Sequence, residues 1–400
     1  MNTEKKLIPL LRFPEYTYAN SFWLENNVGD SIRTLSPPKK LQSNDYKRSG
    51  KYPIIDQSQG FICGYSDDNS AVINKNSKEL IVFGDHTCVL KFIDFPFIQG
   101  ADGIKIFEPK DAAEVDVRYL YQYLVSSQIE SKEYKRHFSE LKEKIFLYPK
   151  TINEQTKIAD CLFAIDSYIS FTNEKVEQLK AHKKSLLQKL FPQKGKTTPE
   201  FRFPEFKKDS AWKKMKLGDV TTVINRRNKS NRSLPIYSIS NKDGFVLQSE
   251  QFDGLDSESR GYDISLYKIV GRNTFAYNPA RINIGSIGYS GDQKDVLISS
   301  LYVCFKTTDE LDDEFLICFL KTAQFNQAVE NNVEGGIRSY LFYENFSRIN
   351  ISLPSLQEQK KIASTILSID DVISKYTNKV SLLNDYKKGL MQQLFPTITK

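Results

Sequence analysis

Two basic, turn-rich loops contain the residue types in this sequence that could do chemistry, and that chemistry is recognition of a polyanion. Each loop begins roughly ten residues after a Gly-Asp pair. Arginine can read guanine, and asparagine or glutamine can read adenine, with two hydrogen bonds each, whereas lysines mainly hold phosphates. The alternative for either loop is a solvated surface without a ligand. The basic residues of the two loops, SPPKKLQSNDYKRSGKY and NRRNKSNR, are Lys39, Lys40, Lys47, Arg48, Lys51, Arg226, Arg227, Lys229 and Arg232.

Further candidate binding residues flank turns in both halves of the chain. They belong to FGDHTCVLK and EYKRHF in the first half, and to AYNPARINIGS and EGGIRSY in the second. Arg136 and Arg338 each lie some 15 residues before a predicted long helix, which supports their equivalence. A buried or structural role is the alternative for each of these candidates, which are His86, Thr87, Lys91, Arg136, His137, Tyr277, Asn278, Arg281, Arg338 and Ser339.

The sequence contains no recognisable constellation for catalysis. In the GKTT segment, residues 195–198, a P-loop would need a further glycine five residues before Gly195, and Leu190 stands at that position. An adenine methyltransferase would place an aromatic residue after Pro-Pro, but Lys39 follows the pair here, and the Pro-Asp of a PD…(D/E)xK nuclease is missing. The glycines of NIGSIGYSG lack the GxGxxG spacing and indicate turns. We therefore predict that the chain is not an enzyme.

Length, charge and cysteine content restrict the class of protein further. Four hundred residues predict two or more domains, and no apolar run is long enough to span a bilayer. The net charge of +7, from 56 basic and 49 acidic residues, permits a polyanionic partner. The five cysteines form no CxxC pair and the three histidines complete no ligand spacing. We therefore expect reduced thiols, no metal site and a cytoplasmic protein.

The candidate loops must be positioned by a repeated unit. Residues 154–192 align without gaps on residues 358–396, and about half of the positions are identical. A weaker repeat precedes each copy, because RFPEYTYANSFWLENNVGD and RFPEFKKDSAWKKMKLGDV share RFPE, a tryptophan and Gly-Asp. The chain is therefore predicted to be two copies of one unit, each a globular segment followed by a helix.

Each predicted helix carries an apolar stripe with alternating spacings of four and three, which is typical of a coiled-coil seam. Lys183 and Lys387 interrupt the two stripes at equivalent positions. Both helices begin at a capping box, Thr-x-x-Glu or Ser-x-x-Glu, and both end at Phe-Pro. The predicted seam residues are Ile158, Leu162, Ile165, Ile169, Val176, Leu179, Leu186, Leu190, Ile362, Ile366, Ile369, Ile373, Val380, Leu383, Leu390 and Leu394.

The repeat predicts a cyclic arrangement. If a pseudo-two-fold axis relates the copies, the helices run antiparallel, and the two ends of the chain meet in a noncovalent version of the joint at its centre. The predicted fold class is α/β (α+β), with mixed α/β domains at residues 1–148 and 193–352 and spacer helices at residues 149–192 and 353–396. The alternative is a dimerisation coiled coil with two unrelated domains.

Over essentially all 400 residues the chain resembles the specificity (S) subunit of Type I restriction–modification enzymes. The resemblance is carried by LYPKTINEQTKIA…FAIDSYI and LPSLQEQKKIA…LSIDDVI, by the LFP that ends both helices, and by RFPEFKKDSAWKKMKLGD. YNPARINIGSIG and RHFSELKE resemble that family as well, whereas FPEYTYANSFWLENNVGD is more divergent. The resemblance implies a non-catalytic subunit in which each globular unit is a target recognition domain for one half of a bipartite DNA site. The helices would set the gap between the halves.

The resemblance also implies the partners. Two modification subunits would dock on the helices and methylate adenine N6 with S-adenosylmethionine, and restriction subunits would translocate and cut double-stranded DNA with ATP. The chain itself would need no cofactor, because S-adenosylmethionine, ATP and Mg belong to those subunits. The sequence leaves open a modification-only system without a restriction subunit. An alternative of another class is a coiled-coil scaffold whose globular ends bind proteins.

Overall fold

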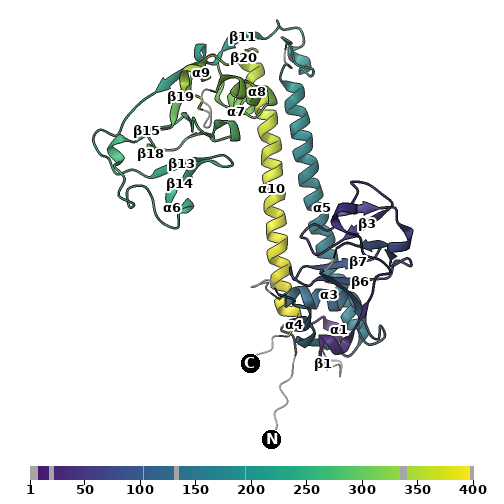
Figure 1. Cartoon of the computed structure of the whole chain (residues 1–400). Coiled ribbons are helices and arrows are strands. Elements are labelled where there is room, and N and C mark those ends of the chain that lie inside the picture. Colours follow the sequence, from purple (N-terminus) through teal and green to yellow (C-terminus); the bar gives the residue numbers. More distant parts are fainter. Residues whose placement is uncertain are drawn as a thin grey trace. The chain divides into compact units, whose positions relative to one another are not determined.

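The computed structural model describes residues 8–17, 22–101, 103–129, 135–193, 195–333 and 340–396. The chain divides into two compact units. Unit 1 consists of residues 1–174 and 377–400, and unit 2 consists of residues 175–376. Each unit therefore combines one globular segment with a part of each of two long helices (Figure 1).

The two predicted long helices are confirmed. Helix α5 spans Ile152–Leu190 and helix α10 spans Leu356–Leu394, with 39 residues each. All sixteen predicted seam residues are buried or half-buried, so the apolar stripes face protein. No helix in the part of the chain that the structure describes combines the length and the apolarity needed to cross a membrane.

The helices run antiparallel within each unit, as predicted. In unit 1 the first turns of α5 and the last turns of α10 share a core that includes Ile158 and Leu394. In unit 2 the last turns of α5 and the first turns of α10 share a core that includes Leu190 and Ile362. Each globular segment therefore packs against the start of one helix and the end of the other.

The lysines that interrupt the stripes form ion pairs between the helices. In unit 1, Lys387 of α10 donates to both carboxylate oxygens of Asp166 of α5, at 2.6 and 2.7 Å. In unit 2, Lys183 of α5 binds Asp370 of α10 in the same way. These lysines are therefore paired polar positions in an otherwise apolar seam.

The described residues of unit 1 form three sheets. Strand β1 (Trp23–Asn27) pairs with β10 (Ile145–Pro149). The first four-stranded sheet has the order β2 (Ile32–Leu35), β9 (Ile104–Pro109), β6 (Leu80–Gly84) and β7 (Leu90–Ile93), and the second has the order β4 (Gly64–Ser66), β3 (Tyr52–Ile55), β8 (Phe97–Gln99) and β5 (Val72–Ile73). Strands β3 and β8 are parallel. The short helices in its described residues are α1 (Pro14–Thr17), α2 (Val28–Ser31), η1 (Ser43–Asp45), η2 (Asn69–Ala71), α3 (Val117–Ser126) and α4 (Phe138–Glu143).

Unit 2 repeats this arrangement. Strand β11 (Lys213–Lys216) pairs with β20 (Asn350–Leu353). The four-stranded sheets have the orders β12 (Thr221–Ile224), β19 (Val303–Thr307), β16 (Phe275–Tyr277), β17 (Ile287–Tyr289), and β14 (Gly244–Leu247), β13 (Ile236–Ser240), β18 (Val296–Ile298), β15 (Lys268–Val270). The short helices are η3 (Pro204–Phe206), η4 (Leu217–Asp219), α6 (Gln248–Gln251), η5 (Ile264–Leu266), η6 (Ile282–Ile284), α7 (Asp313–Phe319), α8 (Ala323–Asn332) and α9 (Tyr343–Ser347).

The two units therefore share one strand order, which confirms the repeat and the mixed α/β fold. Sequence explains the central strands, because a short apolar run such as LIVFG in β6 is typical of a strand covered on both faces. Every residue of β6 is buried, and so is every residue of its counterpart β16. Helix α3 packs against this sheet in unit 1, through the core that joins Tyr119 to Phe107.

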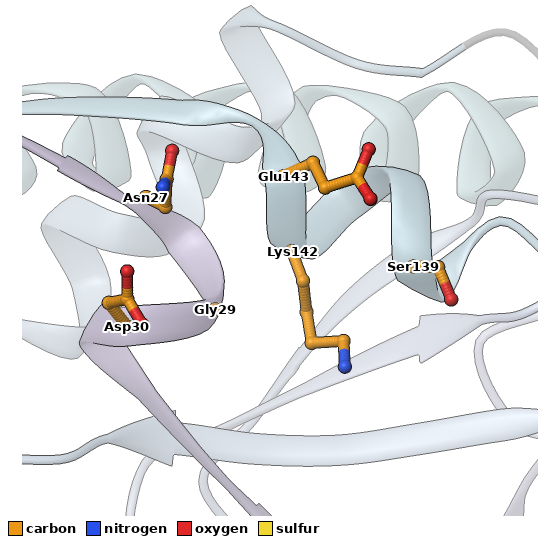
Figure 2. Close-up of a pocket in the computed structure, with 6 residues that line it drawn as sticks. All are labelled: Asn27, Gly29, Asp30, Ser139, Lys142 and Glu143. Carbon is orange, nitrogen blue, oxygen red and sulfur yellow. The ribbon is translucent and has the colours of Figure 1, made fainter.

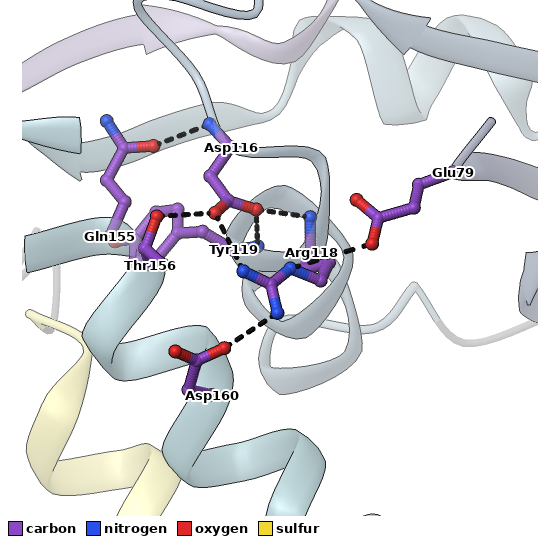
Figure 3. Close-up of polar contacts among 7 residues, drawn as sticks. All are labelled: Glu79, Asp116, Arg118, Tyr119, Gln155, Thr156 and Asp160. Atoms are coloured by element: carbon purple, nitrogen blue, oxygen red, sulfur yellow. Dashed lines mark hydrogen bonds and ion pairs between the residues drawn. The ribbon is translucent and has the colours of Figure 1, made fainter. Parts of the chain in front are cut away.

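The glutamine near the start of each long helix ties that helix to its globular segment. In unit 1 the Gln155 side-chain oxygen accepts a hydrogen bond from the Asp116 amide, at 2.9 Å (Figure 3). Asp116 in turn caps α3 and accepts from the Thr156 hydroxyl. The Gln155 amide donates to the carbonyls of Glu114 and Pro149. Gln359 makes the same three bonds in unit 2, to Asp312, Glu310 and Pro354.

The arginine of each RFPE segment closes a joint between a helix start and a helix end. Arg12 binds the buried carboxylate of Glu154 with two hydrogen bonds, and Arg202 binds Glu358 in the same way. Beside these pairs, the Leu11 amide donates to the Gln393 carbonyl, and the Phe201 amide donates to the Lys189 carbonyl. The second joint is covalently linked through residues 190–200. The first joins the two ends of the chain without a covalent link, as the sequence predicted.

Replacing Gly218 by alanine should destabilise the protein by about 1–3 kcal/mol. Gly218 in η4 and Gly29 in α2 belong to the repeated Gly-Asp pairs. A Cβ at Gly218 would lie 2.8 Å from the Ser347 Cβ, and a Cβ at Gly29 would lie 2.9 Å from the Lys142 Cβ. Urea denaturation measures the change. Gly389→Ala is the control, because a Cβ at that helical position meets nothing within 4 Å and should stabilise. An unchanged stability of Gly218→Ala would show that this close contact can relax.

Candidate nucleic-acid interface

The first basic loop lies along the β4–β3–β8–β5 sheet of unit 1. Lys40 forms a β-bridge with Gln99, and Lys47 forms one with Tyr65. Two of the lysines bind neighbouring carboxylates: Lys39 binds Asp68 at 2.7 Å, and Lys47 binds Asp67 at 3.0 Å. Hydrogen bonds from the Lys39 ammonium and from the hydroxyl and amide of Ser70 lower the pKa of Asp68 to about 2. Exposed ion pairs of this kind are weak, so both lysines remain available to an anionic ligand.

The remaining basic residues of this loop are Arg48 and Lys51, and both are exposed. The Lys51 ammonium lies 5.1 Å from the centre of the Tyr52 ring. The Lys51 backbone amide donates to the Asp67 carboxylate. The loop is therefore fixed to the sheet by its main chain while these two side chains face solvent.

The second basic loop lies along edge strand β15 of unit 2. Arg226 and Arg232 share the carboxylate of Asp295, at 3.0 and 3.1 Å. Burial alone would raise the pKa of Asp295, but hydrogen bonds from Arg232 and Arg226 hold it below its ordinary value. The fully buried Asn228 side chain fixes the loop by binding the amide and the carbonyl of Arg232. The exposed residues of this loop include Arg227 and Lys229.

The two loops follow Gly-Asp at a similar distance but bridge to different strands of their sheets. The first forms bridges to residues at strands β8 and β4, whereas Arg227 forms its bridge with Lys268 of β15. The equivalence that the sequence suggested therefore holds for chain order and not for strand pairing. Asn228 was missed as a structural residue, although its place within a run of basic and polar residues is typical of a loop-fixing asparagine.

Three of the predicted binding residues, Lys91, His137 and Tyr277, are buried, and their assignment to direct contact is wrong. Lys91 is 3% exposed, and Tyr277 is 0% exposed. The Lys91 ammonium donates to the carbonyls of Asp56 and Gly60, and burial lowers its pKa. Tyr277 packs against Phe305 and Phe346 in the core of unit 2, and burial raises the pKa of its hydroxyl. None of the three side chains can reach a ligand on the surface.

Several loops of unit 1 meet beyond the carboxyl ends of β3, β8 and β6. The Thr87 hydroxyl, in the β6–β7 turn, donates to the Gln57 carbonyl in the β3–β4 loop. His86 Nδ1 lies 3.0 Å from the Lys135 carbonyl. The amide of the buried His137 donates to the Asp85 carbonyl. His86 is half-buried and Arg136 is exposed at this convergence, so the structure brings these two predicted residues close together.

The corresponding loops of unit 2 meet in a similar way. The Leu341 amide donates to the Pro279 carbonyl, and the Ser286 hydroxyl donates to the Ile239 carbonyl. Arg281 is exposed there, whereas the half-buried Asn278 uses its side-chain oxygen to accept from the Ala280 amide. The predictions for Arg338 and Ser339 lie outside the described residues.

A separate surface pocket lies between α2 and α4 of unit 1, with a volume of about 410 Å³ (Figure 2). Its lining residues are Asn27, Gly29, Asp30, Ser139, Lys142 and Glu143. With two carboxylates and one ammonium, it does not favour a polyanion. Within the described parts of the chain, no group of three or more His, Cys, Asp or Glu residues is placed to hold a metal ion.

Comparison with known proteins gives one consistent family. The family model described as "Type I restriction modification DNA specificity domain" matches residues 27–181 and 209–382. The Type I restriction enzyme MjaVIII specificity subunit of Methanocaldococcus jannaschii is 22% identical over 397 residues, which cover 93% of this chain and 92% of that protein. The EcoR124I/EcoR124II specificity subunit of Escherichia coli is 24% identical over 169 residues, which cover 40% of this chain and 41% of that protein.

The fold is similar to a solved structure as well. The Type-I restriction-modification system S subunit from M. genitalium superposes with a TM-score of 0.65. The sequence identity is 17%, and the match covers 98% of this chain and 100% of that chain. At this identity the similarity is evidence for the fold.

Proposed function

Because this chain belongs to the Type I restriction modification DNA specificity family and is a specificity subunit with two tandem target recognition domains, we propose that each unit reads one half of a bipartite DNA target. The observation that supports the proposal is the repeated unit itself. Both units have the same strand order, and both carry an exposed basic loop beside one of their four-stranded sheets, β4–β3–β8–β5 in unit 1 and β14–β13–β18–β15 in unit 2. Two similar readers joined by helices suit two half-sites separated by an unread gap.

Within each unit, basic loops would hold the DNA backbone and neighbouring side chains would read base edges. In unit 2, Arg226 and Arg232 are partly exposed and paired with a single carboxylate, which leaves donors of both guanidinium groups for DNA. In unit 1, Arg48, Lys51 and Arg136 are exposed candidates. Binding should weaken steeply with salt, because several phosphate contacts release counterions.

The helices would carry the partner subunits. We infer that two modification subunits dock on α5 and α10 and supply adenine-N6 methylation. S-adenosylmethionine, and the ATP and Mg used by restriction subunits, would bind to those partners and not to this chain. Family membership assigns DNA specificity to this chain and catalysis to its partners.

Co-expression with the modification partner in a methylation-free host should produce N6-methyladenine in a single split motif, mapped by long-read sequencing. Two short half-sites around a fixed gap are expected. Exchanging residues 1–145 for those of another recognition domain should change only one half-site. A continuous motif, or a change in both half-sites after the exchange, would contradict two independent readers.

Charge reversal separates this function from a protein-binding scaffold. The triple variant Arg226→Glu, Arg227→Glu, Arg232→Glu should reduce methylation at least tenfold, because three phosphate or base contacts are lost. The control reverses Lys213, Lys214 and Lys216, which are exposed on strand β11 of the same unit. Unchanged methylation by the first triple variant, in a complex shown to assemble, would favour the scaffold.

A further inference from the structure

We propose that the β3–β4 loop of unit 1, residues 56–63, is a preorganised base-reading loop, that Gln59 and Phe61 at its tip contact DNA bases, and that Lys91 positions it from beneath. The inference rests on the proposed function and adds to it a reading element outside the basic loops. Lys91 is here a positioning residue, because its buried side chain touches the loop and not the DNA.

Lys91 holds the loop by its main chain. Its ammonium donates to the Asp56 carbonyl at 2.8 Å and to the Gly60 carbonyl at 2.6 Å, at the start and the middle of the loop. A buried ammonium is unfavourable unless it is hydrogen-bonded. Since Lys91 is buried and the two carbonyls compensate its charge, a change in loop conformation would leave that charge with fewer partners.

The base of the loop is fixed by side-chain hydrogen bonds. The Asp56 carboxylate accepts from the Cys63 thiol and from the Ser58 amide, both at 2.8 Å. The Thr87 hydroxyl donates to the Gln57 carbonyl at 2.7 Å, which ties the loop to the neighbouring turn. A loop ordered before binding loses less conformational entropy when it meets its ligand.

Unit 2 has neither the lysine nor the long loop at the equivalent positions. Gly288 of unit 2 occupies the position in the sheet that Lys91 occupies in unit 1. Lys91 pairs with Val82, which also pairs with Ile106. Gly288 pairs with Ala276, which also pairs with Cys304, the counterpart of Ile106. The β13–β14 turn of unit 2 has only residues 241–243. A Cβ at Gly288 would lie 3.0 Å from the Gly244 Cα. Where unit 2 packs backbone on backbone, unit 1 has a lysine that supports a longer loop.

The tip of this longer loop presents recognition chemistry. Phe61 is 48% exposed, Ile62 is 40% exposed, and Gln59 is exposed. Glutamine can read adenine with two hydrogen bonds, and an apolar side chain can contact a thymine methyl group or wedge between base steps. The exposed cations Lys135 and Arg136 lie next to the same loop cluster, through the contact of His86 with the Lys135 carbonyl. These charges favour DNA as the occupant.

The test uses the assembled complex with modification subunits and two DNA libraries, each randomised in one half-site. The half-site of unit 1 is first assigned by the exchange of residues 1–145. The variant Gln59→Ala, Phe61→Ala should lose about tenfold or more of its preference at one or more positions of that half-site. Its preference within the other half-site should stay. Phe252→Ala, which removes an exposed phenylalanine of unit 2, is the control and should leave the half-site of unit 1 unchanged.

Lys91→Met should relax the same half-site without changing the other, which a general loss of stability would not do. A graft that should keep the fold replaces residues 56–63 by the turn 241–243 and combines it with Lys91→Gly, copying unit 2. It should methylate with little discrimination in the half-site of unit 1. Retained discrimination by the graft, or by the Gln59→Ala, Phe61→Ala variant, would overturn the loop assignment while the split motif stands. Failure of the unaltered complex to methylate any split motif would instead overturn the proposed function.

Discussion

Replacing Arg202 by methionine should lower the free energy of unfolding of unit 2 by about 3–5 kcal/mol, because it leaves a buried carboxylate without its partner. The Glu358 side chain is 1% exposed, and its two oxygens accept from Arg202 at 2.9 and 2.7 Å. The same guanidinium donates to the carbonyls of Asp209 and Ser210. Its removal therefore affects both the helix start and the segment that enters unit 2.

The chain has two tryptophans, one in each unit, and this makes the measurement specific. Trp212 lies in the core of unit 2, with its Nε1 3.4 Å from the Glu358 carboxylate. In a Trp23→Phe background, urea denaturation followed by fluorescence reports on unit 2. The expected result is a lower transition midpoint for Arg202→Met.

Two control variants define the interpretation. Arg348→Met removes an exposed arginine that pairs with Glu344 four residues away, and should change stability by less than about 0.5 kcal/mol. Adding Glu358→Leu to Arg202→Met should recover part of the loss, because no unpaired charge remains buried. Equal effects of Arg202→Met and Arg348→Met would mean that the joint does not depend on this ion pair.

Local periodicity explains why the helices could be predicted from the sequence. The seam positions follow from spacing within one segment, and the helix bounds follow from the capping residues 151 and 355 and the prolines 192 and 396, which lie just outside the helices. Lys387 could be recognised as an interruption, but its partner could not. Asp166 lies 221 residues away, and its pairing depends on the register of two helices.

The sequence predicted which loops are basic, but it did not predict which strands those loops lie against. The basic loops are visible as charge, whereas their strand partners come from long-range pairing that no local pattern contains. Lys91 shows a signal that was missed. Burial alternates along LKFI in β7, so that Lys91 and Ile93 share the buried face. Period-two alternation places them together from sequence alone, and a lysine on that face should have been assigned a buried partner. Tyr277 ends a continuous buried run in β16, where no alternation exists to read.

The Glu-Gln pair at the start of each long helix and the RFPE segments also show that sequence alone does not identify interaction partners. Their repetition identified them as important, but repetition does not say what they bind. The structure supplies the reason, since Glu154 and Gln155 hold, respectively, the incoming arginine and the cap of α3. Adjacent residues on the helix thus connect to two segments that are far apart in the sequence.

Replacing Lys387 by aspartate should lower the free energy of unfolding of unit 1 by about 2–3 kcal/mol, because a second carboxylate would then face Asp166 beside the helix seam. The Lys387 side chain is 12% exposed and that of Asp166 is 36% exposed. Asp166 also accepts from the Gln122 amide at 2.7 Å, so it cannot turn away without breaking a second hydrogen bond. The measurement is urea denaturation in a Trp212→Phe background, which leaves Trp23 to report on unit 1.

The exchanged pair, Lys387→Asp with Asp166→Lys, decides whether the two charges act on each other. A double-mutant cycle should give a coupling energy of about 1–2 kcal/mol, limited by solvent screening at the partly exposed aspartate. Lys388→Asp is the matched control, because that lysine is exposed on the same helix within unit 1. If the exchanged pair is as unstable as the sum of its single variants, the lysine acts by packing its aliphatic chain in the seam and not by fixing the register through charge. If the coupling is found, the equivalent exchange of Lys183 and Asp370 should show it again in unit 2.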